Sequence, residues 1–186
     1  KHSKCLTERV YLPTIVSGRV IWHLGYSVSK SAVAFTESYG QFQRAALEHE
    51  PSYQVQGALT DGFDSTVGSM RALFPGARLG FCLRHALNKL PDKLVGVPAS
   101  MRRKLRSKFH ALLHRCRQRK SLRVVAMGQC LRHFANHIDT TAGEEQGERI
   151  RHWFETKKAG WYAVLEDPKM PAMSTVLDQA HNALDR

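Results

Sequence analysis

Three consecutive segments in the middle of the chain constrain its fold more than any other feature. Residues 54–59 have the character of a short buried strand and lead into the turn dipeptide Asp61-Gly62. Residues 65–74 are expected to form a short helix that a Pro-Gly dipeptide ends, and residues 78–82 are β-like again. Because strand, helix and strand follow one another directly, the pattern predicts a mixed α/β sheet.

A β-hairpin is expected ahead of this unit. Residues 10–16 and 19–25 are both rich in β-branched and aromatic side chains, and a Ser-Gly turn signal separates them. Pro13 favours an edge strand or a bulge in the first of these strands, because proline cannot donate a main-chain hydrogen bond.

A long helix is predicted between the hairpin and the central unit. Residues 29–50 contain few breakers, and their apolar side chains recur at roughly helical spacing. Ser27 or Ser29 could cap its start, and Pro51 ends it. A further helix is expected to begin at Leu83.

The chain is strongly basic, and one segment accounts for much of this. There are 28 Lys and Arg against 16 Asp and Glu, a formal net charge of +12. This balance favours a polyanionic partner, most often nucleic acid, over a merely basic soluble protein. Residues 102–123 contain ten Lys or Arg and no acid. The ten are Arg102, Arg103, Lys104, Arg106, Lys108, Arg115, Arg117, Arg119, Lys120 and Arg123.

The basic segment has the pattern of an amphipathic helix. Leu105, Phe109, Leu112 and Leu113 give such a helix an apolar side and leave the cations on the other. Such a face can bind phosphates with salt-dependent affinity. A solvated face is the alternative, although solvated faces usually mix charges of both signs.

More helices are expected towards the end of the chain. Residues 122–137, 148–154, 161–165 and 175–185 have helical patterns, and residues 140–147 are predicted to form a loop.

The chain contains no apolar run near 18 residues and no signal-peptide pattern, so it is expected neither to span a membrane nor to be exported. Its four cysteines form no secreted-type framework, which favours the reducing cytoplasm.

Two aspartates are candidates for a functional site. Asp61 follows a predicted strand, where α/β sheets place ligands, although an ordinary Asp-Gly turn is the simpler explanation. Asp64, on the same loop, is expected instead to lie at a helix N-terminus. Asp178 lies on the predicted last helix, three residues before His181 and on the same side. A solvated position is the alternative for Asp178.

Two Cys-x-x-His tetrapeptides could hold a metal ion. Cys82 and His85 follow the predicted strand, and Cys130 and His133 repeat the spacing in a helical context. Four such ligands suit a tetrahedral zinc ion. The long separation of the two pairs favours packed cysteines and hydrogen-bonded histidines instead, so a zinc site is the less favoured interpretation.

Several of these segments together resemble one enzyme family. Residues 60–66 (TDGFDST), 73–75 (LFP) and 81–85 (FCLRH), with residues 174–179 (STVLDQ), are similar to the central block of bacterial insertion-sequence transposases of the DDE class. The resemblance implies a ribonuclease H-like fold. It divides the chain into an N-terminal part of the catalytic domain, a basic all-helical insertion and a returning catalytic helix. These parts are residues 1–91, 92–165 and 166–186.

The resemblance also implies a reaction and a set of site residues. Asp61 matches the second of three catalytic acids and Asp178 the third, and the three acids together would hold two Mg²⁺ ions. Cys82 and His85 would support the site. The activity would be DNA-strand cleavage and transfer on transposon ends and target DNA, carried out in the cytoplasm at the nucleoid, with a homodimer as one option for assembly.

The chain departs from the family mainly in lacking a residue that matches the first catalytic acid. Before Asp61 the chain carries only glutamates as acids, and none of them matches. In the family a Lys-His pair like Lys1-His2 can closely follow the first acid. We therefore expect the first strand and its acid just upstream of Lys1, and this chain to be a fragment that catalyses poorly by itself. A non-catalytic basic DNA-binding remnant and a zinc-stabilised adaptor are the alternatives.

Overall fold

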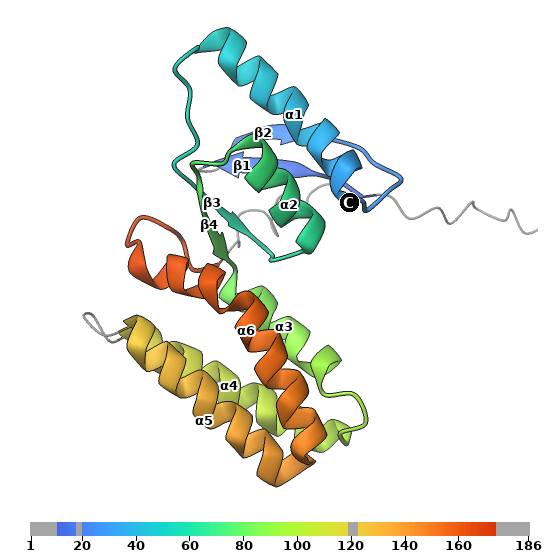
Figure 1. Ribbon diagram of the computed structural model, residues 1–186, viewed down its shortest axis with the longest axis vertical. Helices are drawn as coiled ribbons and strands as arrows, with labels where there is room; N and C mark the ends of the chain where they lie inside the picture. The colour runs from blue at the N-terminus through green and yellow to red at the C-terminus, as the bar shows by residue number, and fades with distance from the viewer. Residues whose placement is uncertain (1–10, 18–19, 119–122, 174–186) are drawn as a thin grey trace, which may run out of the picture. The chain divides into compact units, whose positions relative to one another are not determined.

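The computed structural model describes residues 11–17, 20–118 and 123–173 of the chain (Figure 1). Over these residues the structure is mixed α/β and mostly helical, with two small sheets of two strands each. The predicted α/β class is therefore confirmed. The described residues form two compact units, which are considered separately below. The first contains residues 11–17, 20–56 and Phe63–Ala77, and the second contains Gly57–Gly62 and residues 78–118 and 123–173.

The first unit begins with the predicted hairpin. Strands β1 (Thr14–Ser17) and β2 (Val20–Leu24) pair antiparallel. The register is irregular between Ile15 and Val16, close to the position where Pro13 favoured a bulge or an edge. The carbonyl of Pro13 accepts a hydrogen bond from the N–H of Gly25 at 2.7 Å, which extends the pairing beyond β1.

Helices α1 (Ala32–His49) and α2 (Asp64–Leu73) pack against each other in the first unit. The cap of α1 is Ser31, whose Oγ accepts the N–H of Ala34 at 3.2 Å, so the expected caps Ser27 and Ser29 were wrong. Ser27 and Ser29 instead form a local turn. The Oγ of Ser27 donates a hydrogen bond to the carbonyl of Ser29 and accepts one from the N–H of Ser29.

The second unit is organised on a parallel strand pair. Strands β3 (Gly57–Thr60) and β4 (Arg78–Phe81) are in register, with Thr60 opposite Phe81. Helix α3 (Leu83–Lys93) follows β4 with Cys82 as its N-cap residue. The predicted order strand, helix, strand, helix is confirmed here, since α2 connects β3 to β4 in the sequence.

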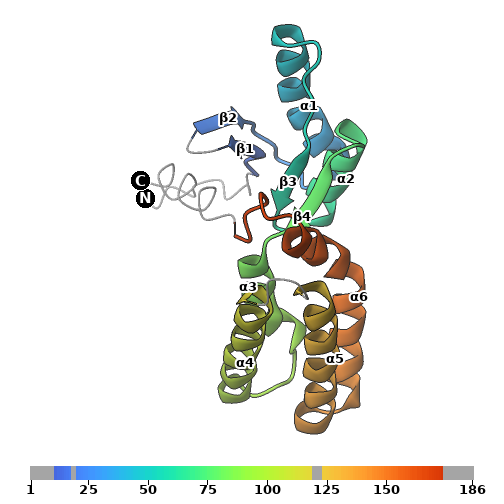
Figure 2. The ribbon, with the colours of Figure 1, turned by 90° about the vertical axis from the view of Figure 1, so that its left-hand side faces the viewer.

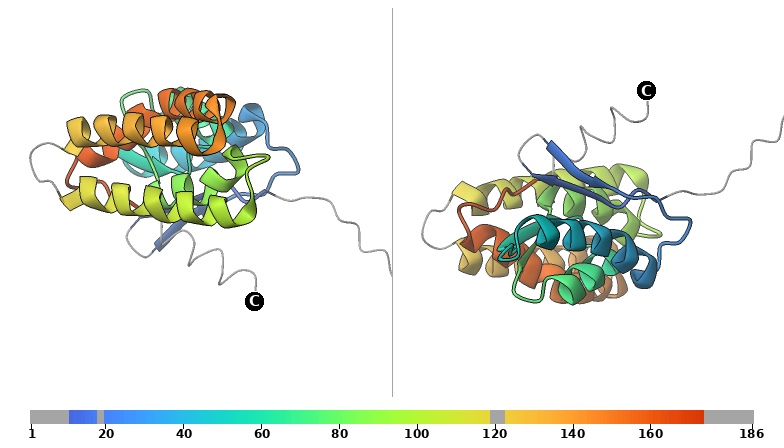
Figure 3. Two further views of the ribbon diagram at one scale, coloured as in Figure 1. Left: turned by 90° about the horizontal axis from the view of Figure 1, so that it is seen from below. Right: turned by 90° about the horizontal axis from the view of Figure 1, so that it is seen from above.

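Three long helices complete the second unit. They are α4 (Ala99–Gln118), α5 (Arg123–Ala142) and α6 (Glu144–Glu166), and α5 packs against both of the others (Figures 2 and 3). Their core is aromatic: the rings of Phe109 and Phe154 stack with centroids 5.6 Å apart, and Phe134 lies 5.0 Å from Phe109. Of the helices in the described part of the chain, none is both long and apolar enough to cross a membrane.

The predicted loop at residues 140–147 was wrong. Helix α5 continues to Ala142 and α6 begins at Glu144, so the connection is the single residue Gly143 at φ +96°. The two short helices expected at residues 148–154 and 161–165 are parts of α6. Glycines inside α6 caused the error, because isolated glycines weaken a helical pattern.

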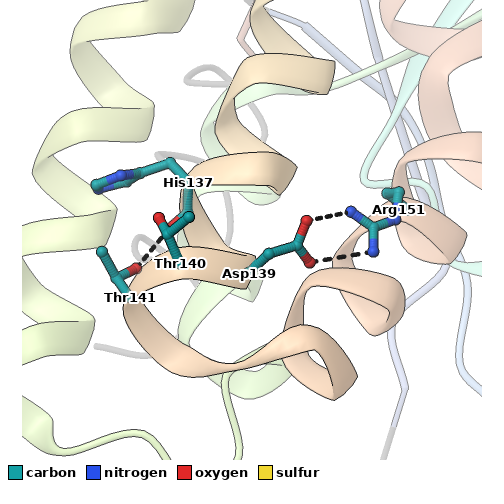
Figure 4. Close-up of polar contacts among 5 residues, drawn as sticks. All are labelled: His137, Asp139, Thr140, Thr141 and Arg151. Carbon is teal, nitrogen blue, oxygen red and sulfur yellow. Dashed lines mark hydrogen bonds and ion pairs between the residues drawn. The ribbon is translucent and has the colours of Figure 1, made fainter.

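A bidentate ion pair joins α5 to α6 beside this connection. Arg151 Nη1 and Nη2 lie 2.7 and 3.0 Å from the two carboxylate oxygens of Asp139 (Figure 4). Gly147 lies directly against Asp139, and a methyl group at position 147 would overlap the carboxylate. Gly147 thus lies inside a helix, where it permits the close approach of α5 and α6, and it does not belong to a loop.

Gly160 permits a second close approach, between α6 and β4. A methyl group at position 160 would overlap the ring of Phe81, whereas Gly68 in α2 has only ordinary contact around its Cα.

We expect Gly160→Ala to lower the free energy of unfolding by about 2 kcal/mol, even after alanine's helix propensity returns about 1 kcal/mol. Urea denaturation followed by helical circular dichroism measures this. Gly68→Ala is the control and should stabilise slightly; an equal gain from Gly160→Ala would contradict the packing.

Candidate functional site

The turn after β3 places Asp61 at the carboxyl end of a parallel strand. Thr60 is buried, and its Oγ1 accepts the N–H of Gly62 at 3.1 Å. The carbonyl of Thr60 accepts the N–H of Cys82 at 2.8 Å. Gly62 has φ +78°, a conformation that suits glycine. The Asp61 side chain is exposed beside this turn. An exposed carboxylate at such a strand end can take part in ligand binding.

The neighbouring candidates lie where the sequence suggested. Cys82 is buried at the start of α3 and is tied through its main chain to Thr60. His85 follows in the first turn of α3 and is half-buried. Asp64 is in the first turn of α2, which confirms the expectation that it is a helix N-terminal residue.

Lys157 is part of this turn and was missed by sequence reasoning. Its Nζ donates to the carbonyl of Gly62 at 2.9 Å and lies 5.7 Å from the centre of the Phe81 ring. A usable signal was present, because Lys157 is separated by three or four helical positions from the buried Phe154 and Trp161. A lysine on the core side of a helix usually has a specific partner.

The described residues do not assemble a metal centre. Within residues 11–17, 20–118 and 123–173, no three His, Cys, Asp or Glu side chains are grouped so that they could hold a metal ion. Cys82 and His85 therefore form no such group with Cys130 and His133. Asp178, the proposed third acid, lies outside the described residues, so Asp61 is the described member of the proposed acid set.

Helix α4 presents an exposed cationic face. Its buried residues are Leu105, Phe109, Leu113 and Cys116, which confirms the predicted amphipathic helix. Seven of the ten predicted cations lie on this helix: Arg102, Arg103, Lys104, Arg106, Lys108, Arg115 and Arg117. Arg123 begins α5, and Arg119 and Lys120 lie outside the described residues.

The cationic face is anchored at its start and borders α5. Arg106 Nη2 donates to Oδ1 of Asn88 at 3.0 Å, which ties α4 to α3. On the other side, the ring of His137 is directed towards α4 (Figure 4). Burial, together with the positive charge of Lys108, lowers the pKa of His137.

The lowered pKa of His137 predicts a pH dependence of stability. The unfolded chain binds this proton more readily than the native state, so stability is lost as the pH falls below the ordinary histidine value near 6.5. Burial lowers the pKa of His23 in the same direction. We expect the urea midpoint to be lower at pH 5.5 than at pH 7.5, and His137→Gln to reduce this difference. An unchanged difference in the variant would assign the effect elsewhere.

Comparison of the chain with protein-family models, with curated proteins and with solved structures gives no match. The residues that bear on function are therefore those described above. They are an exposed carboxylate on a turn held from two sides and, in the same unit, a helix face rich in cations.

Proposed function

We propose that this chain is part of a DDE-class DNA transposase with a ribonuclease H-like catalytic domain. The observation that carries the proposal is the exposed Asp61 at the carboxyl end of β3, in a turn where Thr60 and Lys157 both hydrogen-bond to the main chain of Gly62. An acid at this position of a parallel strand pair is suited to phosphoryl-transfer chemistry. The acid-free cationic face of α4 in the same unit supports DNA as the substrate.

Magnesium is the proposed cofactor, and the described residues fit it in part. Asp61 offers the hard oxygen ligands that Mg²⁺ takes, and Asp178 would supply the next carboxylate. When bound, the metal would activate a water or 3′-hydroxyl and stabilise the leaving oxygen of an in-line displacement. The protein's own contribution would be to hold the main chain next to Asp61, through the hydrogen bonds to the N–H and the carbonyl of Gly62.

The α4 face would hold the DNA backbone. Lys and Arg that neutralise phosphates release condensed counterions, which gives affinity without sequence preference. Contacts of this kind position the duplex but do not read its bases. Base-specific recognition of transposon ends is therefore not assigned to α4.

Mg²⁺-dependent strand transfer tests the proposal. Residues 1–186 alone are expected to show no transfer of a labelled DNA end, and a protein extended upstream to include the proposed first acid is expected to show it. Robust transfer by residues 1–186 would refute the prediction that a catalytic acid is missing from this chain. The absence of transfer in every extended protein, with DNA binding intact, would refute the proposed transposase activity.

A non-catalytic DNA-binding module is the second candidate. It is favoured by the α4 face, whose cations do not depend on Asp61 for their position. In a gel-shift titration, this candidate predicts that Asp61→Ala and Mg²⁺ leave DNA affinity unchanged even in the extended protein.

A further inference from the structure

Helix α6 reaches the turn that carries Asp61. Lys157 is half-buried, and its ammonium group donates a 2.9 Å hydrogen bond to the carbonyl oxygen of Gly62, the residue directly after Asp61. A lysine in the middle of a helix ordinarily extends into solvent, since its charge is strongly hydrated. Here the side chain is directed at one main-chain carbonyl far away in the sequence.

The packing beneath Lys157 determines its position. Gly160, one turn later on α6, lies against the ring of Phe81, and the Lys157 ammonium lies 5.7 Å from the centre of the same ring. Phe81 is the register partner of Thr60 on the adjacent strand. The contact of Gly160 with Phe81 therefore determines how closely α6 packs on the strand pair, and so whether the Lys157 side chain can contact the Gly62 carbonyl.

Gly62 is held on both of its main-chain polar groups. Its N–H donates to Oγ1 of the buried Thr60 at 3.1 Å, and its carbonyl accepts from Lys157. Gly62 also has φ +78°, a conformation that suits glycine, and these two bonds stabilise it. Asp61 lies between Thr60 and Gly62, and its side-chain direction follows from the conformation of this short turn.

We propose that Lys157 is a positioning residue for Asp61. By holding the Gly62 carbonyl, it fixes the direction in which the Asp61 carboxylate leaves β3, and it brings a positive charge next to the turn. Its effect on chemistry rests on the transposase function proposed above. Its effect on the turn does not, and the two can be measured separately.

Amide hydrogen exchange on residues 1–186 tests the structural part. The Gly62 amide is expected to exchange at least about tenfold more slowly than its intrinsic rate in the unmodified chain. Lys157→Met should remove most of this protection, because the turn that brings the Gly62 N–H to Oγ1 of Thr60 loses its hydrogen bond at the Gly62 carbonyl, and Lys157→Arg should retain it. Lys158→Met is the matched control, because Lys158 pairs with Glu155 on its own helix. An unprotected Gly62 amide in the unmodified chain overturns the proposal without any variant.

Strand transfer by the upstream-extended protein tests the chemical part. Lys157→Met is expected to lower kcat about tenfold and to raise the Mg²⁺ concentration needed for half-maximal rate, with KM for DNA unchanged. Lys157→Arg should recover most of the rate. If Gly62 loses protection but an active enzyme keeps its rate, the positioning role is wrong. If no extended protein is active while exchange behaves as expected, the transposase function fails and the Lys157 contact stands.

Discussion

Replacing Asp61 with Asn is expected to reduce Mg²⁺-dependent strand transfer by at least about 100-fold in a protein that includes the upstream acid. Even groups that only orient a metal ligand contribute about 10–100-fold, and a direct ligand should contribute at least the upper end of that range. The substitution preserves the size of the side chain. It leaves the hydrogen bonds of Thr60 and Lys157 to Gly62 in place, so folding should be retained.

Asp64→Asn is the matched control for this measurement. Asp64 is an exposed aspartate on the same loop, but it belongs to the first turn of α2. There a carboxylate stabilises the helix N-terminus by about 0.3–1 kcal/mol. Its replacement should reduce stability slightly and leave strand transfer close to normal. Equal losses from the two substitutions would mean that Asp61 has no special role.

Removing three cations from α4 is expected to lower DNA affinity by roughly 100-fold at 0.15 M salt, if each neutralises one phosphate. Lys104, Lys108 and Arg115 suit this test, because all three are exposed and lie on one side of the helix. Their replacement by Gln should also reduce the slope of log affinity against log salt by about 2.7. Fluorescence anisotropy with a short duplex, at several salt concentrations, measures both quantities.

A second triple variant separates the α4 face from net charge. Gln in place of Arg71, Lys89 and Lys169 removes the same three charges from exposed positions outside α4. Its affinity should fall far less, and its salt slope should change little. A similar loss in both variants would show that DNA responds to the overall charge of the chain, and the α4 interface would then be wrong.

Local patterns in the sequence predicted most of the individual elements. Helix α1, the β1–β2 hairpin and the order from β3 to α3 follow from turn dipeptides, prolines and alternating or helical spacing. These signals act within a few residues, so they can be interpreted without knowledge of the tertiary contacts. The amphipathic pattern around Phe109 likewise predicted α4 and its exposed cations.

The errors arose where a residue's role depends on a distant neighbour. Gly147 ends the predicted loop and Gly160 lies between two predicted helices, yet both lie within one continuous helix, where each accommodates a side chain from another element. Those side chains are Asp139 and Phe81. Nothing in the local sequence identifies them, since the contacts form only when α6 packs on α5 and β4.

The sequence by itself determined the α/β class, the position of Asp61 after a strand and the cationic side of α4, because these depend on local spacing and charge. The tertiary structure decided that Asp61 lies on a turn held from both sides. It also brought Lys157 to that turn from a helix almost one hundred residues later in the chain. A hydrogen bond of this kind requires the close packing of Gly160 on Phe81, which only the folded chain brings about.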